Sequence, residues 1–214
     1  MSAPAWERSL EVHTAAQTHA LAAALGAVLE TGDLLVLTGE LGAGKTTFTQ
    51  GLGEGLGVRA GIISPTFVLV RIHPNLPGGP RPGGPDLVHV DAYRLESAAE
   101  IDDIDLENTM DSAVTVVEWG RGRVEHLSDS RLEVELHRTL GGAAASAQTP
   151  ETPAETGASP VLDFDTDDDD EPRTVVIRGF GPRWAEAPTL PGPETMPGAG
   201  PLPGTTPQTP ERNP

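Results

Sequence analysis

Residues 34–52 read LLVLTGELGAGKTTFTQGL, and the octapeptide at 39–46, GELGAGKT, has the spacing G-x-x-x-x-G-K-[ST]. Glycines at these positions let successive backbone N–H groups converge on phosphate oxygens, and a helix that follows points its positive end at the same oxygens. Lys45 is then expected to reach the β and γ phosphates of a nucleotide, and the Thr46 hydroxyl to bind Mg²⁺. The apolar run before the octapeptide predicts a buried strand, and the residues after it predict a helix.

This pattern predicts a phosphate-binding loop, and the alternative is a glycine-rich turn with an exposed lysine. That alternative is disfavoured because Lys45 is the only lysine among 14 Lys and Arg residues. Guanine-specific proteins of this class normally use an Asn-Lys-x-Asp motif, and no second lysine exists to form one, so ATP is favoured over GTP. The residues expected to contact ATP are Gly39, Glu40, Leu41, Gly42, Ala43, Gly44, Lys45, Thr46 and Thr47.

Strand and helix patterns alternate outward from this loop and predict an α/β protein. Ser97 and Glu100 have the spacing of a helix capping box, and two strands flank a Pro/Gly-rich loop as in a long hairpin. The expected helices cover residues 14–30, 45–56 and a segment from 97 toward 108, and the expected strands cover residues 34–37, 67–72, 87–90, 113–117, 131–138 and 173–180. We therefore expect the three-layer P-loop NTPase fold, with a mainly parallel sheet and antiparallel strands late in the chain.

The chain is expected to form one domain over residues 1–184. Within it, residues 73–86 read as a flexible loop, and residues 139–172 read as a disordered acidic insert in a hairpin. Residues 185–214 are rich in Pro, Gly and Thr and read as a disordered tail. These segments have too little apolar surface to offset the entropy of ordering them.

Composition excludes several classes of protein. The chain has no cysteine, so disulfides and thiolate metal sites are excluded. A net charge of -18 argues against direct, unaided binding to a polyanion such as a nucleic acid. No apolar run is long enough to span a membrane, and the six histidines show no paired ligand spacing. We expect a cytoplasmic protein with no membrane contact.

Two acids follow predicted strands and are expected on the edge of the sheet that carries the loop. Asp91 ends one strand and Glu118 ends another, and ligands of open α/β sheets bind at the carboxyl ends of the strands. A metal-bound triphosphate needs a carboxylate there to hold Mg²⁺ and a group to orient the attacking water. Thr66 lies in a Ser-Pro-Thr segment that is also ordinary turn chemistry. Asp91, Glu118 and Thr66 are the predicted catalytic residues.

Four motifs in order resemble the TsaE (YjeE) family, which are the P-loop ATPases of bacterial tRNA threonylcarbamoyladenosine biosynthesis. The motifs are GELGAGKTTFTQGL at 39–52, ISPTFVLV at 63–70, HVDAYRL at 89–95 and VVEWG at 116–120. The resemblance implies ATP hydrolysis in support of a TsaB–TsaD complex. That complex attaches threonylcarbamoyl to adenosine 37 of tRNAs that read codons beginning with A.

The resemblance also implies roles for individual residues. Thr46 and Glu118 match the family's Mg²⁺ ligands, and Asp91, Thr66 and Trp119 match residues needed for turnover. Residues 14–18 occupy the place of the family's contact to the adenine side, although their residue types match poorly. The loop at 73–86, the insert at 139–172 and the tail depart from the family pattern without interrupting a motif.

Two other functions stay open at this point. A small-molecule kinase on the same fold would use arginines over the phosphates, for which Arg121 and Arg123 are candidates. A nucleotide-dependent docking subunit would bind ATP and seldom cleave it. Nucleotide binding and turnover share residues, so the sequence separates this second alternative poorly from an ATPase.

Overall fold

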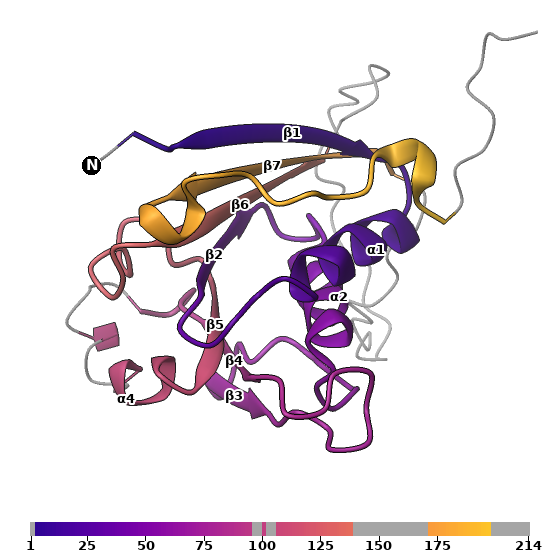
Figure 1. Ribbon diagram of the computed structural model, residues 1–214. Helices are drawn as coiled ribbons and strands as arrows, with labels where there is room; N and C mark the ends of the chain where they lie inside the picture. The colour runs from indigo at the N-terminus through magenta and orange to yellow at the C-terminus, as the bar shows by residue number, and fades with distance from the viewer. Residues whose placement is uncertain (1–2, 96–99, 102–105, 139–170, 198–214) are drawn as a thin grey trace, which may run out of the picture.

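The structure is a computed structural model that describes residues 3–95, 100–101, 106–138 and 171–197. Seven strands form one sheet, with helices packed on both of its faces (Figure 1). The elements in chain order are β1 (Trp6–Val12), α1 (Ala15–Gly26), β2 (Leu34–Gly39), α2 (Lys45–Leu56), β3 (Val70–His73), β4 (Asp86–Asp91), α4 (Glu107–Met110), β5 (Ala113–Glu118), β6 (Arg131–Arg138), β7 (Arg173–Phe180) and the 3₁₀ turns η1 (Pro182–Trp184) and η2 (Pro193–Thr195).

The sheet has a parallel centre and antiparallel edges, which confirms the predicted fold class. The strand order is β1-β7-β6-β2-β5-β4-β3. β2 pairs in parallel with β5 and β6, and β5 pairs in parallel with β4. The other three pairs of neighbouring strands are antiparallel: β6 with β7, β7 with β1, and β4 with β3. A central parallel strand must be apolar on both faces, which is why the residues of β2 form a continuous apolar run.

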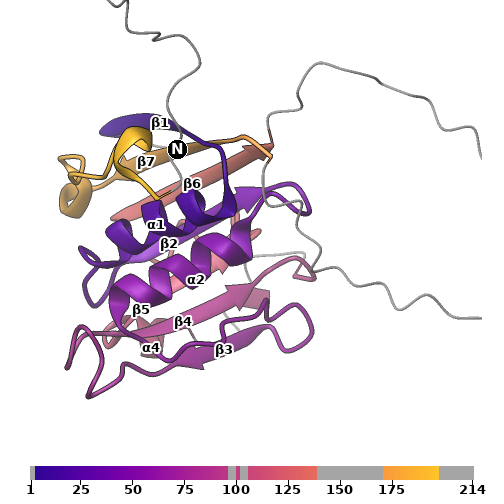
Figure 2. The ribbon, with the colours of Figure 1, turned by 90° about the vertical axis from the view of Figure 1, so that its right-hand side faces the viewer.

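Two hydrophobic cores lie on opposite faces of the sheet. Leu35 and Leu37 of β2 join the core beneath α1 and α2, whereas Leu34 and Val36 join the core on the other face. Figure 2 shows α1 and α2 side by side across the first face, and Figure 1 shows α4 on the second. Alternation along β2 thus divides its side chains between two helical layers.

Helix α2 contains three glycines, and close packing against α1 explains two of them, Gly51 and Gly55. A Cβ built on Gly55 would lie 2.1 Å from the carbonyl oxygen of Ala23 in α1. This distance is far below van der Waals contact, so only glycine fits where the two helices cross. The approach fixes α2, and therefore the loop before it, against α1.

The N-terminal strand β1 was not among the expected elements. Trp6, Leu10 and Val12 lie on one face of this strand, and Arg8 lies on the same face. The arginine therefore interrupts the alternation of apolar and polar residues that would have predicted a strand. Its pairing partner is β7, at the far end of the chain, with Trp6 opposite Gly179. Local pattern alone therefore underestimated the sheet by one strand.

The strand predicted over residues 67–72 begins only at Val70. The backbone N–H groups of Val68 and Leu69 donate to the carbonyl oxygen of Pro65 at 2.9 and 2.8 Å, which closes a turn before the strand. Leu69 has a φ of 67°, a left-handed conformation that a strand does not allow. The turn therefore takes the donors that a longer strand would need.

The loop over residues 73–86 is anchored at the ends of α1 and α2. Asn75 Nδ2 donates to the carbonyl oxygens of Leu56 and Arg81 at 2.9 and 3.0 Å, and Arg81 Nη1 donates to that of Leu29 at 2.8 Å. These bonds hold a loop that the sequence predicted to be flexible.

The packed region extends past Trp184, where the sequence placed the end of the domain. Leu190 packs against the core under α1 and α2, and Met196 is buried in it. Residues 139–170 of the predicted insert and 198–214 of the predicted tail lie outside the described residues, as do 97–99 and 102–105 of the predicted third helix. Among the described residues, no helix is long and apolar enough to cross a membrane.

Candidate nucleotide-binding site

The loop between β2 and α2 has the backbone that its glycines predict. Gly44 is the residue before the first turn of α2 and has a φ of 94°, which side chains other than glycine rarely tolerate. Because α2 begins at Lys45, the unpaired N–H groups of its first turn face the loop. Thr46 and Thr47 follow in that turn and are half-buried.

The side chain of Lys45 is buried and contacts the backbone of the loop that precedes it. Its Nζ donates to the carbonyl oxygens of Gly39 and Glu40, each at 3.0 Å. The ammonium also lies 4.2 Å from the centre of the Trp119 ring. Burial lowers the pKa of Lys45, while the negative charges of Glu118 and Asp91 oppose that change. The ammonium is thus largely desolvated and close to two acids.

Asp91 and Thr66, two of the predicted catalytic residues, are in direct contact. The Thr66 hydroxyl donates to Asp91 Oδ2 at 2.6 Å, and the Ser64 hydroxyl donates to the same oxygen at 3.2 Å. The backbone N–H of Tyr93 donates to Asp91 Oδ1 at 2.9 Å. Asp91 therefore ties the segment that precedes β3 to the end of β4.

Glu118 lies beside Asp91 on the neighbouring strand. The two residues are directly paired in the parallel register of β4 and β5, and both are buried. Glu118 Oε1 lies 2.8 Å from Nε2 of His89, a buried histidine two residues before Asp91. The prediction that the two strand-end acids share the edge of the loop agrees with this register.

Trp119 lies where β5 leaves the sheet. Its φ is 61°, which is uncommon for a bulky residue, and its N–H donates to the carbonyl oxygen of Leu37 at 2.9 Å. The indole packs edge-to-face on Tyr93 with ring centres 5.5 Å apart. This strained backbone places the indole beside the Lys45 ammonium, where a cation–π contact forms.

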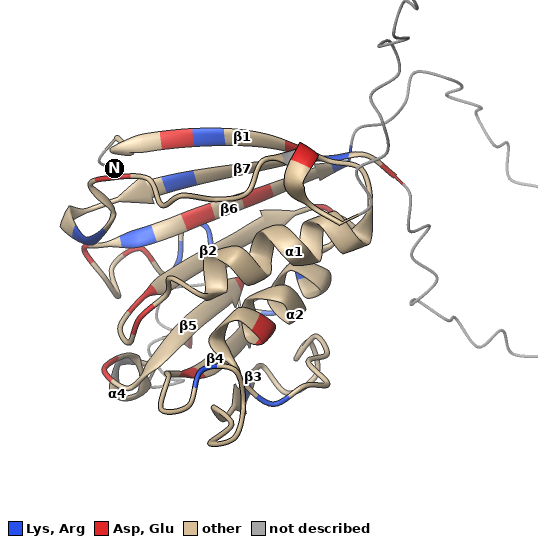
Figure 3. Ribbon diagram, turned by 45° about the vertical axis from the view of Figure 1, so that its right-hand side comes forward, with Lys and Arg blue, Asp and Glu red and all other residues tan. Residues whose placement is uncertain are grey.

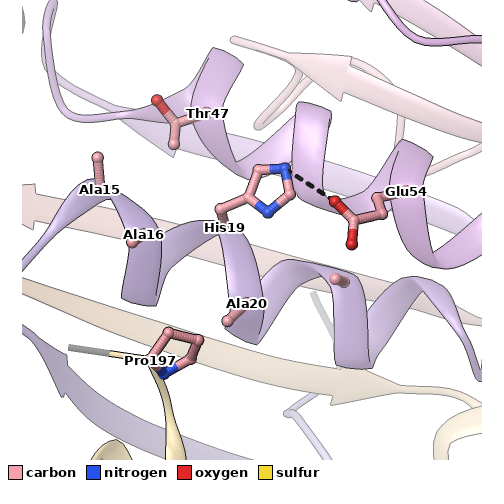
Figure 4. Close-up of a pocket in the computed structure, with 8 residues that line it drawn as sticks. Ala15, Ala16, His19, Ala20, Thr47, Glu54 and Pro197 are labelled. Atoms are coloured by element: carbon pink, nitrogen blue, oxygen red, sulfur yellow. Dashed lines mark ion pairs between the residues drawn. The ribbon is translucent and has the colours of Figure 1, made fainter. Parts of the chain in front are cut away.

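A pocket of about 590 Å³ lies beside the loop, between α1 and α2 (Figure 4). Ala15 and Ala16 belong to the segment that the family resemblance assigns to the adenine side, and they line this pocket together with Thr47 and Pro197. His19 of α1 and Glu54 of α2 close its other end with an ion pair at 3.6 Å. Thr14 caps α1 by accepting a hydrogen bond from the N–H of Gln17.

Sequence reasoning missed two residues near the loop. His89 was dismissed as a ligand because the histidines lack paired spacing, yet it shares the face of β4 with Asp91 and binds Glu118. Arg173, at the start of β7, is buried against Gly44, and its Nε has no partner within the described residues. The two-residue spacing of His89 and Asp91 was a usable signal, whereas nothing local marked Arg173.

The residues at this site suit a hard cation bound through phosphates. Glu118 supplies a carboxylate and Thr46 a hydroxyl, the oxygen ligands that Mg²⁺ prefers. Within the described ranges, no cluster of three or more His, Cys, Asp or Glu side chains is arranged to hold a metal ion alone. A site of this kind fits Mg²⁺, which keeps several waters and relies on substrate phosphates.

The fold and the loop define this chain as a member of the P-loop class of α/β proteins. The family model described as "Threonylcarbamoyl adenosine biosynthesis protein TsaE" matches residues 12–143. The chain therefore belongs to the TsaE family, and with it to tRNA threonylcarbamoyladenosine biosynthesis, as the resemblance implied.

Relatives support this assignment over most of the chain. A Streptomyces coelicolor protein named tRNA threonylcarbamoyladenosine biosynthesis protein TsaE is 45% identical over 164 residues, which cover 76% of this chain and 90% of that protein. A Mycobacterium tuberculosis protein of the same name is 45% identical over 127 residues, covering 56% and 73%. The crystal structure of Bacillus subtilis YdiB aligns with a TM-score of 0.55 at 25% identity and covers 84% of this chain and 89% of that one.

Proposed function

We propose that this chain is an ATPase that supports threonylcarbamoylation of tRNA. The observation that carries the proposal is the meeting of Lys45, Asp91 and Glu118 beside one phosphate-binding loop. A lysine on the loop and acids at the ends of adjacent strands are the parts that nucleotide hydrolysis by this fold requires. Membership of the TsaE family supplies the pathway.

Each residue has a distinct role in this proposal. The backbone N–H groups of residues 39–46 and the Lys45 ammonium bind the phosphates, and Lys45 exchanges its bonds to Gly39 and Glu40 for phosphate oxygens. Thr46 and Glu118 would hold Mg²⁺, which neutralises charge on the phosphates when bound. Asp91, fixed by Thr66, orients the attacking water.

We further propose that the chain acts with a TsaB–TsaD type complex, in the cytoplasm, on adenosine 37 of tRNAs that read codons beginning with A. Its net charge of -18 disfavours direct contact with tRNA, so tRNA is reached through the partners. Trp119 belongs to the turnover machinery because its indole contacts Lys45.

The structure disfavours the kinase alternative. Arg121 forms a two-point ion pair with Glu135, and Arg123 Nη1 donates to the carbonyl oxygen of Ala92 at 2.7 Å. Both arginines that a kinase would place over the phosphates therefore have structural partners. A docking subunit would use the same residues as an ATPase, so only experiment can distinguish these two functions.

The deciding experiment measures Mg²⁺-dependent ATP hydrolysis with and without the partner complex, together with tRNA modification in a strain depleted of this protein. We expect turnover that Glu118→Ala abolishes, with loss of modification. Glu11→Ala, which removes an exposed acid on β1, is the control. Absence of turnover in both settings would overturn the ATPase, and full modification by Glu118→Ala would establish docking instead.

A further inference from the structure

His89 is a fully buried histidine whose ring has one polar contact. Its Nε2 lies 2.8 Å from Glu118 Oε1, and its Nδ1 is buried with no hydrogen-bond partner in the described part of the chain. The side chain has 0% relative exposure. β4 places it on the same face as Asp91, since the two residues are two positions apart.

The environment selects one tautomer of this ring. If the proton is on Nε2, this nitrogen donates a hydrogen bond to the Glu118 carboxylate. The only group of the ring without a partner is then the lone pair on Nδ1. A proton on Nδ1 instead would bury an unpaired N–H and turn a lone pair of Nε2 toward the carboxylate. His89 therefore acts as a hydrogen-bond donor to Glu118.

This bond leaves one oxygen of Glu118 available. Oε1 accepts from His89, whereas Oε2 accepts no hydrogen bond from any described residue. A carboxylate held by one oxygen cannot rotate freely about its last bond, so the position of the other oxygen is fixed as well. Donors of this kind orient metal-binding side chains in many proteins.

We propose that His89 is a positioning residue that holds Glu118 in the orientation in which Oε2 binds Mg²⁺. The inference rests on the proposed function, because it takes Glu118 as a metal ligand. Packing alone does not call for a histidine here, since Leu87, two positions earlier on the same face of β4, fills the core with an apolar side chain. An apolar residue at position 89 would avoid a buried orphan nitrogen.

His73 provides a matched control. It is a second buried histidine, on the adjacent strand β3, with its ring centre 6.3 Å from that of His89. Its Nε2 is also unpartnered within the described ranges, and none of its described contacts involves Glu118. His73→Leu therefore reproduces the loss of a buried imidazole without touching the carboxylate.

The test is binding of ADP, followed by titration calorimetry, over a series of Mg²⁺ concentrations and in EDTA. His89→Leu should weaken the Mg²⁺ affinity of the ADP complex by about 10-fold or more and leave ADP affinity in EDTA unchanged. His89→Gln, whose amide can donate from a similar distance, should recover most of the loss. His73→Leu should behave as the unsubstituted protein.

A double substitution makes the dependence on Glu118 explicit. If His89 acts through that carboxylate, adding His89→Leu to Glu118→Gln should lower Mg²⁺ affinity no further. An unchanged Mg²⁺ affinity in His89→Leu, an equal loss of ADP affinity in EDTA, additive losses in the double variant, or an equal loss in His73→Leu would each overturn the proposal. Failure of the unsubstituted protein to bind ADP at any Mg²⁺ concentration would instead overturn the proposed function itself.

Discussion

At the scale of single residues, the candidate nucleotide site holds a buried ammonium, that of Lys45, beside two buried acids, Asp91 and Glu118. Lys45 is buried at the start of a helix whose own N–H groups are positive, and burial lowers its pKa. Two carbonyl oxygens of the loop accept its hydrogen bonds. Such a group favours ligand binding over stability of the free protein.

Lys45→Met should therefore separate affinity from stability. We expect ATP affinity to fall about 100-fold, because charge-assisted hydrogen bonds to phosphate are lost. The free energy of unfolding of the nucleotide-free protein should change little, because relief of a desolvated charge is offset by the loss of the positive charge beside Asp91 and Glu118. Titration calorimetry and urea unfolding measure the two quantities. Arg59→Met, which removes an exposed positive charge, is the control, and an equal loss of affinity there would contradict the prediction.

Arg173 and Arg131 should respond in opposite ways to the same substitution. Arg173 is buried, its Nε is unpartnered, and no carboxylate pairs with it among the described residues. Arg131 is equally buried but pairs with Glu133 at 2.9 Å and stacks on Phe180. Arg173→Met should leave the unfolding free energy unchanged or raise it by about 1 kcal/mol, whereas Arg131→Met should lower it by about 3 kcal/mol. Urea unfolding measures the unfolding free energy of both variants. Equal decreases in the two variants would contradict this prediction.

At this scale, candidate site residues that lie in short sequence motifs could be predicted from the sequence. Contacts between side chains on different strands could not. The loop, Lys45 and the strand-end acids follow from residue type and local spacing. The bond between His89 and Glu118 depends on β4 lying next to β5 in a particular register, which only tertiary structure fixes. Arg173 reaches the loop from a strand more than 120 residues further along the chain.

At the scale of elements, the crossing of α1 and α2 is the most demanding contact. Gly55→Ala would gain about 1 kcal/mol of helix propensity, but its Cβ meets the backbone of α1, which cannot yield without moving the helix. We expect a net loss of about 2 kcal/mol in urea unfolding.

Gly53→Ala is the matched substitution in the same helix. Its Cβ would meet side-chain atoms only, Cδ1 of Ile62 and, at 3.1 Å, Cγ2 of Val58, so the substitution should cost less than Gly55→Ala. Equal losses for Gly53→Ala and Gly55→Ala would show that helix packing is not the cause.

Elements with strong local patterns were predicted with nearly correct bounds. The apolar residues of β2 and β5 are continuous apart from Thr115, and the buried apolar residues of β6 and β7 alternate with other residues, as expected for strands. In α2 they recur every four positions, as expected for a helix. β1 was missed because an edge strand with one arginine among its inward positions has a weak pattern. β3 was placed three residues early because the turn at Pro65 competes for the same backbone donors.

At the scale of the whole molecule, charge is arranged in rows on the side of the sheet formed by β6, β7 and β1. Figure 3 shows acidic and basic positions next to each other on these three strands. Glu135 of β6 pairs with Arg121 and with Arg178, and Arg178 also pairs with Glu7 of β1. Hydrogen bonding to Arg121 lowers the pKa of Glu135 to about 2.

This arrangement predicts how stability depends on pH. Because the folded-state pKa of Glu135 lies below the ordinary value of 4.5, its contribution is complete above pH 4.5 and is lost as pH falls toward about 2. We expect Glu135→Gln to cost about 1 to 2 kcal/mol at pH 7, a value reduced for solvent screening because Arg121 is 41% exposed. The cost should vanish near pH 2.

Urea unfolding at several pH values measures this difference. Glu11→Gln, at an exposed position of β1, serves as the control and should show a small difference that does not vary with pH. A constant cost of Glu135→Gln between pH 7 and pH 3 would contradict the prediction.

The pairing of β1 with β7 also bears on how the protein is made. β1 leaves the ribosome before the other strands of this sheet, yet its neighbour β7 ends at Phe180. β2 gains β6 only once residues 131–138 have been synthesised. Contacts between such distant segments slow folding and expose unpaired strand edges in the meantime. A nascent chain halted before β7 therefore holds the phosphate-binding loop on a sheet that still lacks β7, and β1 in such a chain has no partner strand.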